Sequence, residues 1–323
     1  GVEAGHPRRC TPLGDFSSSG SEGPGAGYGL AVQATDERGP WATEGVDLVR
    51  AVSGGLLFGI PLLYTMEVWW IGTATEPSRM VAVLLVTFLV VFLLNRTSGF
   101  RSTKDGRAVD AAMDAVEAVA LGLLSVAAVL VLLQEITLDT PLGEALGKVV
   151  YEAMPFGIGI ALAHHFLRRG RSEGDDESGQ AEQGKEGEEG ELRATAADVG
   201  ATVIGALFVA FNIAPTDEVP MLAAALGPPH LLAVVAVSLV VSFSIVFVAG
   251  FSNEEQRHEQ QGILQHPVTE TVACYLIALV CAAAMLWFFQ RLDAASPWQE
   301  SLSHVLVLGL PASVGGAAGR LAV

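Results

Sequence analysis

Acidic residues stand at matching places in the two halves of this 323-residue chain. A shift of 151 positions pairs Glu67 with Glu218, which Asp217 directly precedes, and a shift of 156 positions pairs Asp114 with Glu270. Carboxylates in a low-dielectric site share a proton or hold a cation, because two bare charges at close range cannot both remain ionised. These five acids are therefore candidate pathway residues for protons or small cations.

Each matched pair also has a purely structural interpretation. Glu67 and Glu218 could lie in the lipid headgroup region, fully hydrated and beside the belt of interfacial tryptophans. Asp114 and Glu270 stand near the starts of apolar segments, where the helix macrodipole favours a carboxylate by about 0.3–1 kcal/mol. A functional role requires instead that the acids face one shared interior. The residues alone leave both interpretations open.

Prolines mark the places where helices would break or bend. Pro215 precedes the acidic pair of the second half, and an interrupted helix in a membrane exposes carbonyl groups that can line an ion site. The first half has Tyr64 at the equivalent position, so such a site would be asymmetric. Pro155 and Pro311 match under the 156 shift and are followed by glycines, which predicts kinks and close helix packing, with hinge motion as the alternative.

The elements that must position these residues are apolar helices. Hydrophobic residues make up 51% of the chain, charged residues 16%, and the mean hydropathy is +0.46, which is typical of a membrane protein. Because period-two patterning is absent, the sequence predicts an all-α, polytopic transmembrane bundle of about eight helices, with seven as the alternative. The expected spans are roughly 52–71, 80–94, 111–133, 146–167, 199–221, 231–251, 268–289 and 302–323.

The two shifts also predict the domain organisation. Four spans in each half give both halves the same orientation, so we expect two parallel four-helix repeats. The polar, Gly-, Ser- and Pro-rich start and the acidic stretch between the halves lack the apolar content to build a core. The predicted boundaries are a disordered tail over 1–46, a first repeat over 47–171, a disordered acidic linker over 172–196 and a second repeat over 197–323.

Basic residues set the expected orientation. With the N-terminus in the cytoplasm, all but three of the 18 Lys and Arg residues fall on the cytoplasmic side, the exceptions being Arg79, Lys148 and Arg291. The sequence therefore predicts a multi-pass protein of the inner (plasma) membrane with both termini cytoplasmic, and no cleavable signal peptide. Four tryptophans would lie near the outer interface: Trp69, Trp70, Trp287 and Trp298.

Composition and motifs argue against several other functions. The net charge is −17, but sixteen of the 35 acidic residues lie before Arg50 (seven) or in the linker (nine), so the bundle is close to neutral and nucleic acid is not an expected partner. Neither a zinc-ligand spacing nor a nucleotide or hydrolase motif occurs. We therefore expect no metal, no cofactor and no enzymatic activity.

Two short runs resemble a known family. The run Pro61-Leu62-Leu63-Tyr64-Thr65-Met66-Glu67-Val68-Trp69-Trp70-Ile71-Gly72 and the run Phe211-Asn212-Ile213-Ala214-Pro215-Thr216-Asp217-Glu218 are similar to a bacterial integral membrane family that is known only as a domain of unknown function. The resemblance covers about residues 47–323. It implies a small second membrane protein, encoded nearby, as a partner, and it supplies no activity.

Two functions of different classes follow from these patterns. The first is a cation or proton channel or transporter that uses the matched acids, with membrane lipid and small cations or protons as its partners. The second is a non-transporting membrane scaffold that anchors the small partner protein. An intramembrane enzyme is a more remote third.

Overall fold

The computed structural model describes residues 40–97, 107–173, 188–248, 267–292 and 297–321. Within these ranges the chain is all-helical, with ten α-helices, one short π-helix and no strand. Eight helices are long and apolar enough to span a membrane, which confirms the predicted eight spans. Of the segments predicted to be disordered, residues 1–39 and 174–187 lie outside the described residues.

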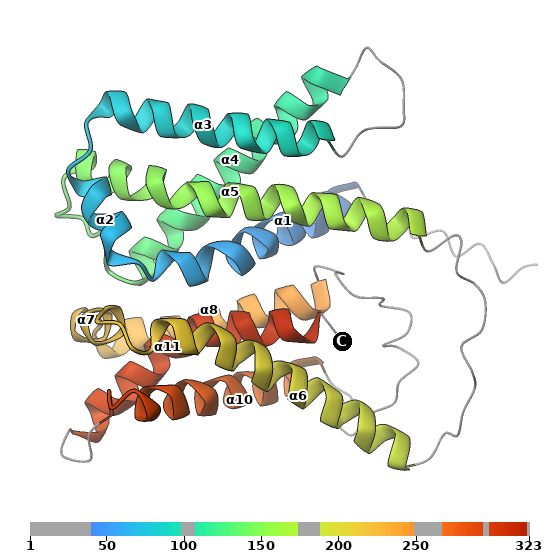
Figure 1. Cartoon of the computed structure of the whole chain (residues 1–323), viewed down its shortest axis with the longest axis vertical. Helices are drawn as coiled ribbons and strands as arrows, with labels where there is room; N and C mark the ends of the chain where they lie inside the picture. Colours follow the sequence, from blue (N-terminus) through green and yellow to red (C-terminus); the bar gives the residue numbers. More distant parts are fainter. Residues whose placement is uncertain (1–39, 98–106, 174–187, 249–266, 293–296, 322–323) are drawn as a thin grey trace, which may run out of the picture. The chain divides into compact units, whose positions relative to one another are not determined.

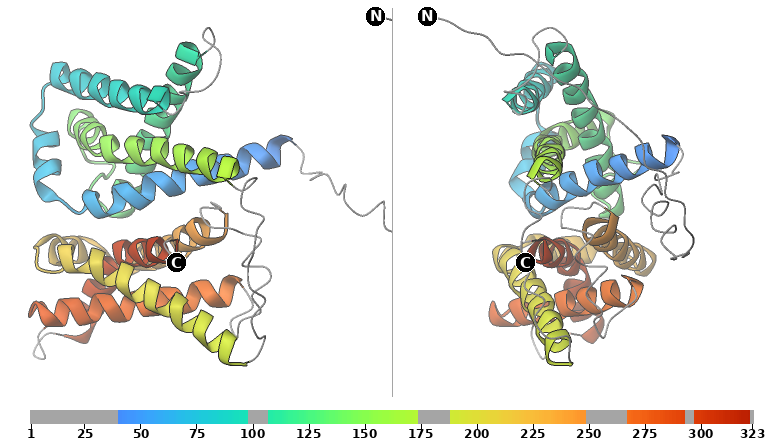
Figure 2. Two further views of the ribbon diagram at one scale, coloured as in Figure 1. Left: turned by 45° about the vertical axis from the view of Figure 1, so that its right-hand side comes forward. Right: turned by 90° about the vertical axis from the view of Figure 1, so that its right-hand side faces the viewer.

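The helices follow the same order in both halves of the chain, a long helix, a short helix and three further long segments. The first half contains α1 (Pro40–Leu63), α2 (Met66–Thr73), α3 (Pro77–Thr97), α4 (Arg107–Leu132) and α5 (Leu142–Glu173). The second half contains α6 (Glu188–Ile213), α7 (Glu218–Ala225), α8 (Pro228–Phe243) with the π-helix η1 (Ser244–Val248), α10 (Pro267–Phe288) and α11 (Trp298–Arg320). Figures 1 and 2 show the short helices α2 and α7 at the same end of the bundle, which we name the short-helix end.

The turns at the short-helix end also correspond. Gln134 after α4 and Gln290 after α10 are the two described non-glycine residues with positive φ, at 61° and 58°. The next backbone N–H in each turn donates back into its helix, from Glu135 to Leu130 at 2.9 Å and from Arg291 to Leu286 at 2.8 Å. These matched turns support the predicted repeat.

Glycines bring a pair of helices into backbone contact in each half. A Cβ atom at Gly159 of α5 would lie 2.6 Å from the carbonyl oxygen of Gly54 in α1. A Cβ atom at Gly315 of α11 would lie 2.5 Å from the carbonyl oxygen of Gly205 in α6. Both pairs correspond under the two sequence shifts. Close approach at small residues is the usual way in which helices associate in lipid.

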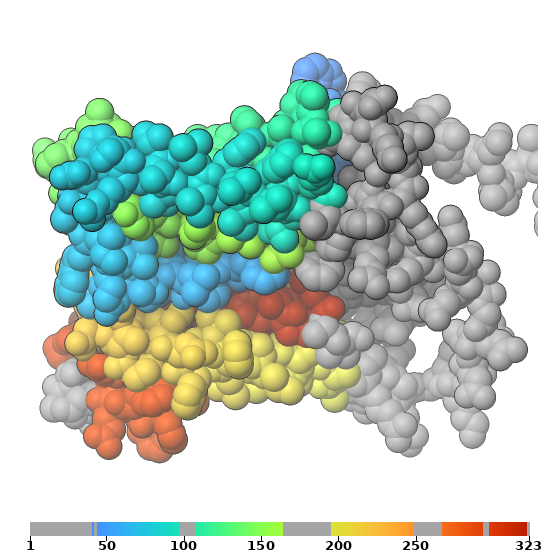
Figure 3. Space-filling view, turned by 45° about the horizontal axis from the view of Figure 1, so that its top comes forward, coloured from blue at the N-terminus to red at the C-terminus, as the bar shows by residue number. Residues whose placement is uncertain are grey.

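One apolar core joins the two halves. Its fully buried members come from both, and include Ile60, Phe156, Leu222 and Leu308. The Tyr64 hydroxyl donates to the Val307 carbonyl at 2.8 Å. Pro311 has no N–H for this carbonyl four residues before it, so Tyr64 supplies the missing donor from the other half. The space-filling view shows red atoms of α11 beside blue atoms of α1 (Figure 3).

Several helix boundaries differ from the sequence prediction. Helix α1 begins at Pro40, inside the segment predicted to be a disordered tail, and the fifth span, expected over 199–221, is divided between α6 and α7. The first span was expected to run unbroken over 52–71, but α1 ends at Leu63 and α2 begins at Met66. Helix α6 begins at Glu188, inside the segment predicted to be linker, because glutamate, alanine, leucine and arginine there are good helix formers.

Candidate functional site

A break interrupts the first span between α1 and α2. Pro61 removes a hydrogen bond from the last turn of α1. Thr65 then adopts an extended backbone, with φ −134° and ψ 96°, which no helix can continue through. Tyr64 is 3% exposed and is held by its bond to Val307. The chain therefore leaves the helix inside the bundle and re-enters one at Met66.

Glu218 approaches this break from the second half. Its side chain lies at the start of α7 and the residue is 5% exposed. The Met66 backbone N–H donates to Glu218 Oε1 at 3.4 Å, so the carboxylate faces the positive end of the α2 dipole. Glu218 Oε2 is buried without a hydrogen-bond partner.

Glu152 approaches the same break from α5. The residue is 1% exposed, and its carboxyl group interacts with the indole of Trp69 in α2. The geometry falls short of a hydrogen bond, because neither Trp69 Nε1 nor Glu152 Oε1 has a partner within bonding distance and angle. Phe156, one turn along the same face of α5, packs against Gly59 of α1. Glu152 therefore points to where α1 ends.

Together Tyr64, Met66, Trp69, Glu152 and Glu218 form a polar group inside the apolar core, which we name the break site. Both carboxyl groups are buried, and each has an oxygen without a partner. A buried carboxylate in apolar surroundings costs several kcal/mol unless a proton, a cation or hydrogen-bond donors compensate its charge. The break site can therefore take up a proton or a small cation.

The other acids predicted at this end of the bundle are exposed. Glu67 lies on the exposed face of α2 and does not share the buried environment of Glu218. Asp217 forms an ion pair with Arg291 at 2.8 Å, and its side chain is 76% exposed. Arg291 also donates to the carbonyl of Pro215, which lies between α6 and α7. A cationic side chain thus already binds the second helix break.

The two predicted acids at the opposite end of the bundle have different surroundings. Asp114 is exposed on α4. Glu270 forms an ion pair with Arg320, whose side chain is 1% exposed and also lies 3.5 Å from Asp198. Arg320 Nη1 contacts Cys274 Sγ at 3.2 Å. This cluster ties α6, α10 and α11 together.

The two matched prolines lie inside helices, as their spacing predicts. Pro155 is within α5 and Pro311 within α11. In each helix a glycine four residues later makes the close contact with α1 or α6 described above. Each proline therefore lies about one turn before a close helix contact.

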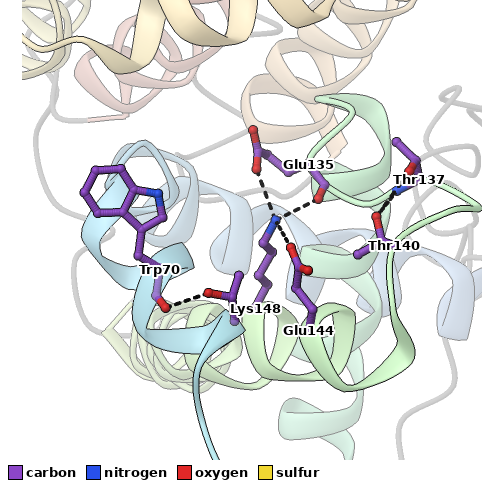
Figure 4. A network of polar contacts seen from close by, with 7 residues as sticks. Trp70, Glu135, Thr137, Thr140, Glu144 and Lys148 are labelled. Atoms are coloured by element: carbon purple, nitrogen blue, oxygen red, sulfur yellow. Dashed lines mark hydrogen bonds and ion pairs between the residues drawn. The ribbon is translucent and has the colours of Figure 1, made fainter.

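Lys148 of α5 is buried and binds two glutamates in a polar network (Figure 4). Lys148 Nζ binds Glu144 at 3.1 Å, and it binds the carboxylate of Glu135 at 3.4 Å and its carbonyl at 3.0 Å. It thereby fixes the turn between α4 and α5. His304 occupies the equivalent position in the second half and interacts with the backbone of Arg291 and with the Glu300 carboxylate.

Several of these residues were missed by the sequence reasoning. Glu152 has Leu308 as its counterpart under the 156 shift, so a search for acids matched in both halves passes over it. The signal was nevertheless present, because Glu152 stands in the middle of an apolar span. Trp69 was expected at the outer interface, but it is 1% exposed within the protein, whereas Trp70, Trp287 and Trp298 are exposed as expected.

The described residues contain no group of three or more His, Cys, Asp or Glu side chains that could hold a metal ion. No curated protein and no solved structure matches this chain. A family of integral membrane proteins does match, over residues 47–323 and so over most of the chain. This multi-pass integral membrane protein therefore belongs to the family described as "Putative integral membrane protein (DUF2391)".

Proposed function

We propose that the protein moves protons or small cations across the membrane and that the carboxyl groups of the break site bind them. The observation that carries the proposal is the burial of Glu152 and Glu218 at one helix break, each with an unpartnered oxygen. Ionisable groups inside a membrane bundle are costly and are typical of ion and proton pathways. Discontinuous helices at such a site are a recurring design of secondary transporters.

The charge of the site favours cations over anions. The start of α2 would attract an anion, but the Glu218 carboxylate already occupies it. The remaining buried groups are a second carboxyl group, an indole and a phenol, none of which offers a positive charge. The break site therefore lacks a positive charge, which a proton or a cation would supply.

The proposed orientation places the short-helix end outside. We place the protein in the inner membrane as two parallel repeats with both termini in the cytoplasm, because the basic residues then lie mostly inside. Glu67 and Asp217 then stand at the outer entrance, and Asp114 and Glu270 at the inner one. These four acids are exposed or ion-paired, which suits residues at an entrance better than residues that bind the transported ion.

A non-transporting scaffold is the second candidate. It is favoured by the backbone contacts at Gly54, Gly159, Gly205 and Gly315, which give a rigid bundle, and by the exposure of Glu67 and Asp114. Such a bundle could anchor a small membrane protein without moving any ion.

Ion flux distinguishes the two functions. We expect purified protein in liposomes, with the potential clamped by valinomycin and potassium, to pass protons or sodium ions above the rate of empty liposomes. Glu218→Gln should reduce this flux at least about tenfold, because the amide can neither bind nor release a proton, and tenfold corresponds to about 1.4 kcal/mol.

Glu67→Gln is the matched control, since it makes the same change at the equivalent position of the other half on an exposed side chain. It should retain most of the flux. Wild-type protein that passes no ion, alone or with its neighbouring small protein, would leave the scaffold as the function.

A further inference from the structure

Glu152 stands inside a candidate membrane span. It is the eleventh residue of Leu142–Ala163, which places it about 15 Å along the helix from Leu142 at a rise of about 1.5 Å per residue, and α5 continues beyond Ala163 to Glu173. The residue is 1% exposed. Its immediate neighbour Ala153 and Phe156, one turn further on, belong to the fully buried apolar core. Bulk water therefore does not reach this carboxyl group.

The Glu152 carboxyl group interacts with a donor side chain without forming a hydrogen bond to it. The Trp69 indole carries one N–H and no acceptor, and it is the side chain that interacts with the carboxyl group. A metal cation in this position would face that N–H, whereas it needs several oxygen ligands. No cluster of three metal-binding side chains occurs in the described part of the chain. The chemistry around Glu152 therefore suits a proton better than a metal cation.

The donor and the acid occur together in one half alone. Under the shifts of 156 and 151 positions, Glu152 corresponds to Leu308 and Trp69 corresponds to Pro220. Leu308 is fully buried, so the same place in the second half is filled by an apolar side chain. An apolar pair thus fits this position in the fold, and packing does not require a carboxyl group there.

We infer that Glu152 is a proton-binding site, a carboxyl group that holds a proton inside the apolar bundle and exchanges it at the break between α1 and α2. Protonation adds H⁺ to one carboxylate oxygen and breaks no other bond. The oxygen that carries no proton remains an acceptor for a donor such as the Trp69 N–H. Glu218, which reaches the same break at Met66, is the second carboxyl group available to pass or receive the proton.

This inference deepens the proposed transport function. It rests on that function only where it identifies the transported species as a proton. The proton site itself is independent of transport. Its test therefore reads the protonation of Glu152 directly and not the flux.

Infrared spectroscopy of the protein in lipid films tests the proton site. We expect wild-type protein near neutral pH to show the carbonyl stretching band of a protonated carboxyl group in apolar surroundings. Glu152→Gln should remove this band, Glu152→Asp should shift it, and Glu67→Gln should leave it unchanged. A wild-type protein without the band between about pH 5 and about pH 9, or a band that survives in Glu152→Gln, would overturn the inference.

A second measurement needs no variant. A hydrophobic carbodiimide reacts with protonated carboxyl groups in apolar surroundings, and mass spectrometry of the labelled wild-type protein should find the adduct on Glu152. Labelling confined to other carboxyl groups would contradict the inference even if the variants fail to fold. A band at Glu152 without any ion flux would keep the proton site and refute transport, and flux without the band would refute the proton site alone.

Discussion

Gly315→Ala is expected to lower the free energy of unfolding by more than the roughly 1–3 kcal/mol that is usual for overpacking a core. The new Cβ would lie 2.5 Å from the Gly205 carbonyl oxygen and 2.6 Å from Val209 Cγ2. The first obstacle is backbone, which cannot turn aside as a side chain would, so α6 and α11 must separate. Thermal unfolding of the purified protein in detergent measures the loss.

Gly200→Ala is the matched control, because a Cβ at Gly200 of α6, the helix that Gly315 contacts, meets nothing within 4 Å. Alanine there should be neutral or stabilising by up to about 1 kcal/mol, since it forms helix better than glycine. The two identical substitutions are therefore expected to act in opposite directions. Equal effects would show that α6 and α11 do not approach this closely.

Arg320→Leu is expected to cost about 3 kcal/mol of stability, at the lower end of the range for breaking a buried ion pair, because the Glu270 carboxylate that loses its partner is still partly exposed. The Arg320 side chain is 1% exposed, and the Glu270 side chain with which it pairs is 21% exposed. Unfolding in detergent again provides the measurement. The variant should weaken the packing of α6, α10 and α11 against one another, because Arg320 binds residues of the other two helices.

The double variant Arg320→Leu with Glu270→Gln separates the ion pair from simple loss of packing. Removal of the stranded carboxylate should restore part of the stability, because the penalty of the single variant comes mainly from the unpaired charge. Asp198 can then be solvated, since its side chain is 45% exposed. A double variant that is less stable than Arg320→Leu would contradict this view of the cluster.

The architecture could be predicted from the sequence because it depends on long apolar runs and on positions that match at fixed shifts. The runs gave the eight spans, and the matched residues Gln134 and Gln290 end equivalent helices with the same backbone geometry. The matched prolines and the glycines that follow them also indicated close helix packing. Such features are local in the sequence, so they can be identified without a structure.

The candidate site was less accessible because it depends on contacts between distant segments. The break after Leu63 follows from Pro61, from the extended Thr65 and from the Tyr64 bond to Val307, 243 residues away. The sequence marked Glu218 as interesting but could not say that its carboxylate caps α2 while Glu67 faces outward. The counterpart of Glu152 is a leucine, so acids matched between the two halves do not include Glu152.

Proton uptake into liposomes at zero membrane potential, driven by a pH gradient alone, tests whether the buried carboxyl groups of the break site carry protons. Wild-type protein and Glu67→Gln should acidify or alkalise the lumen faster than empty liposomes. Glu152→Gln should lose at least about tenfold of this flux while eluting as the same monodisperse species, and Glu152→Asp should retain a part of it. Proton uptake by Glu152→Gln at the wild-type rate would contradict a role for the buried carboxyl group.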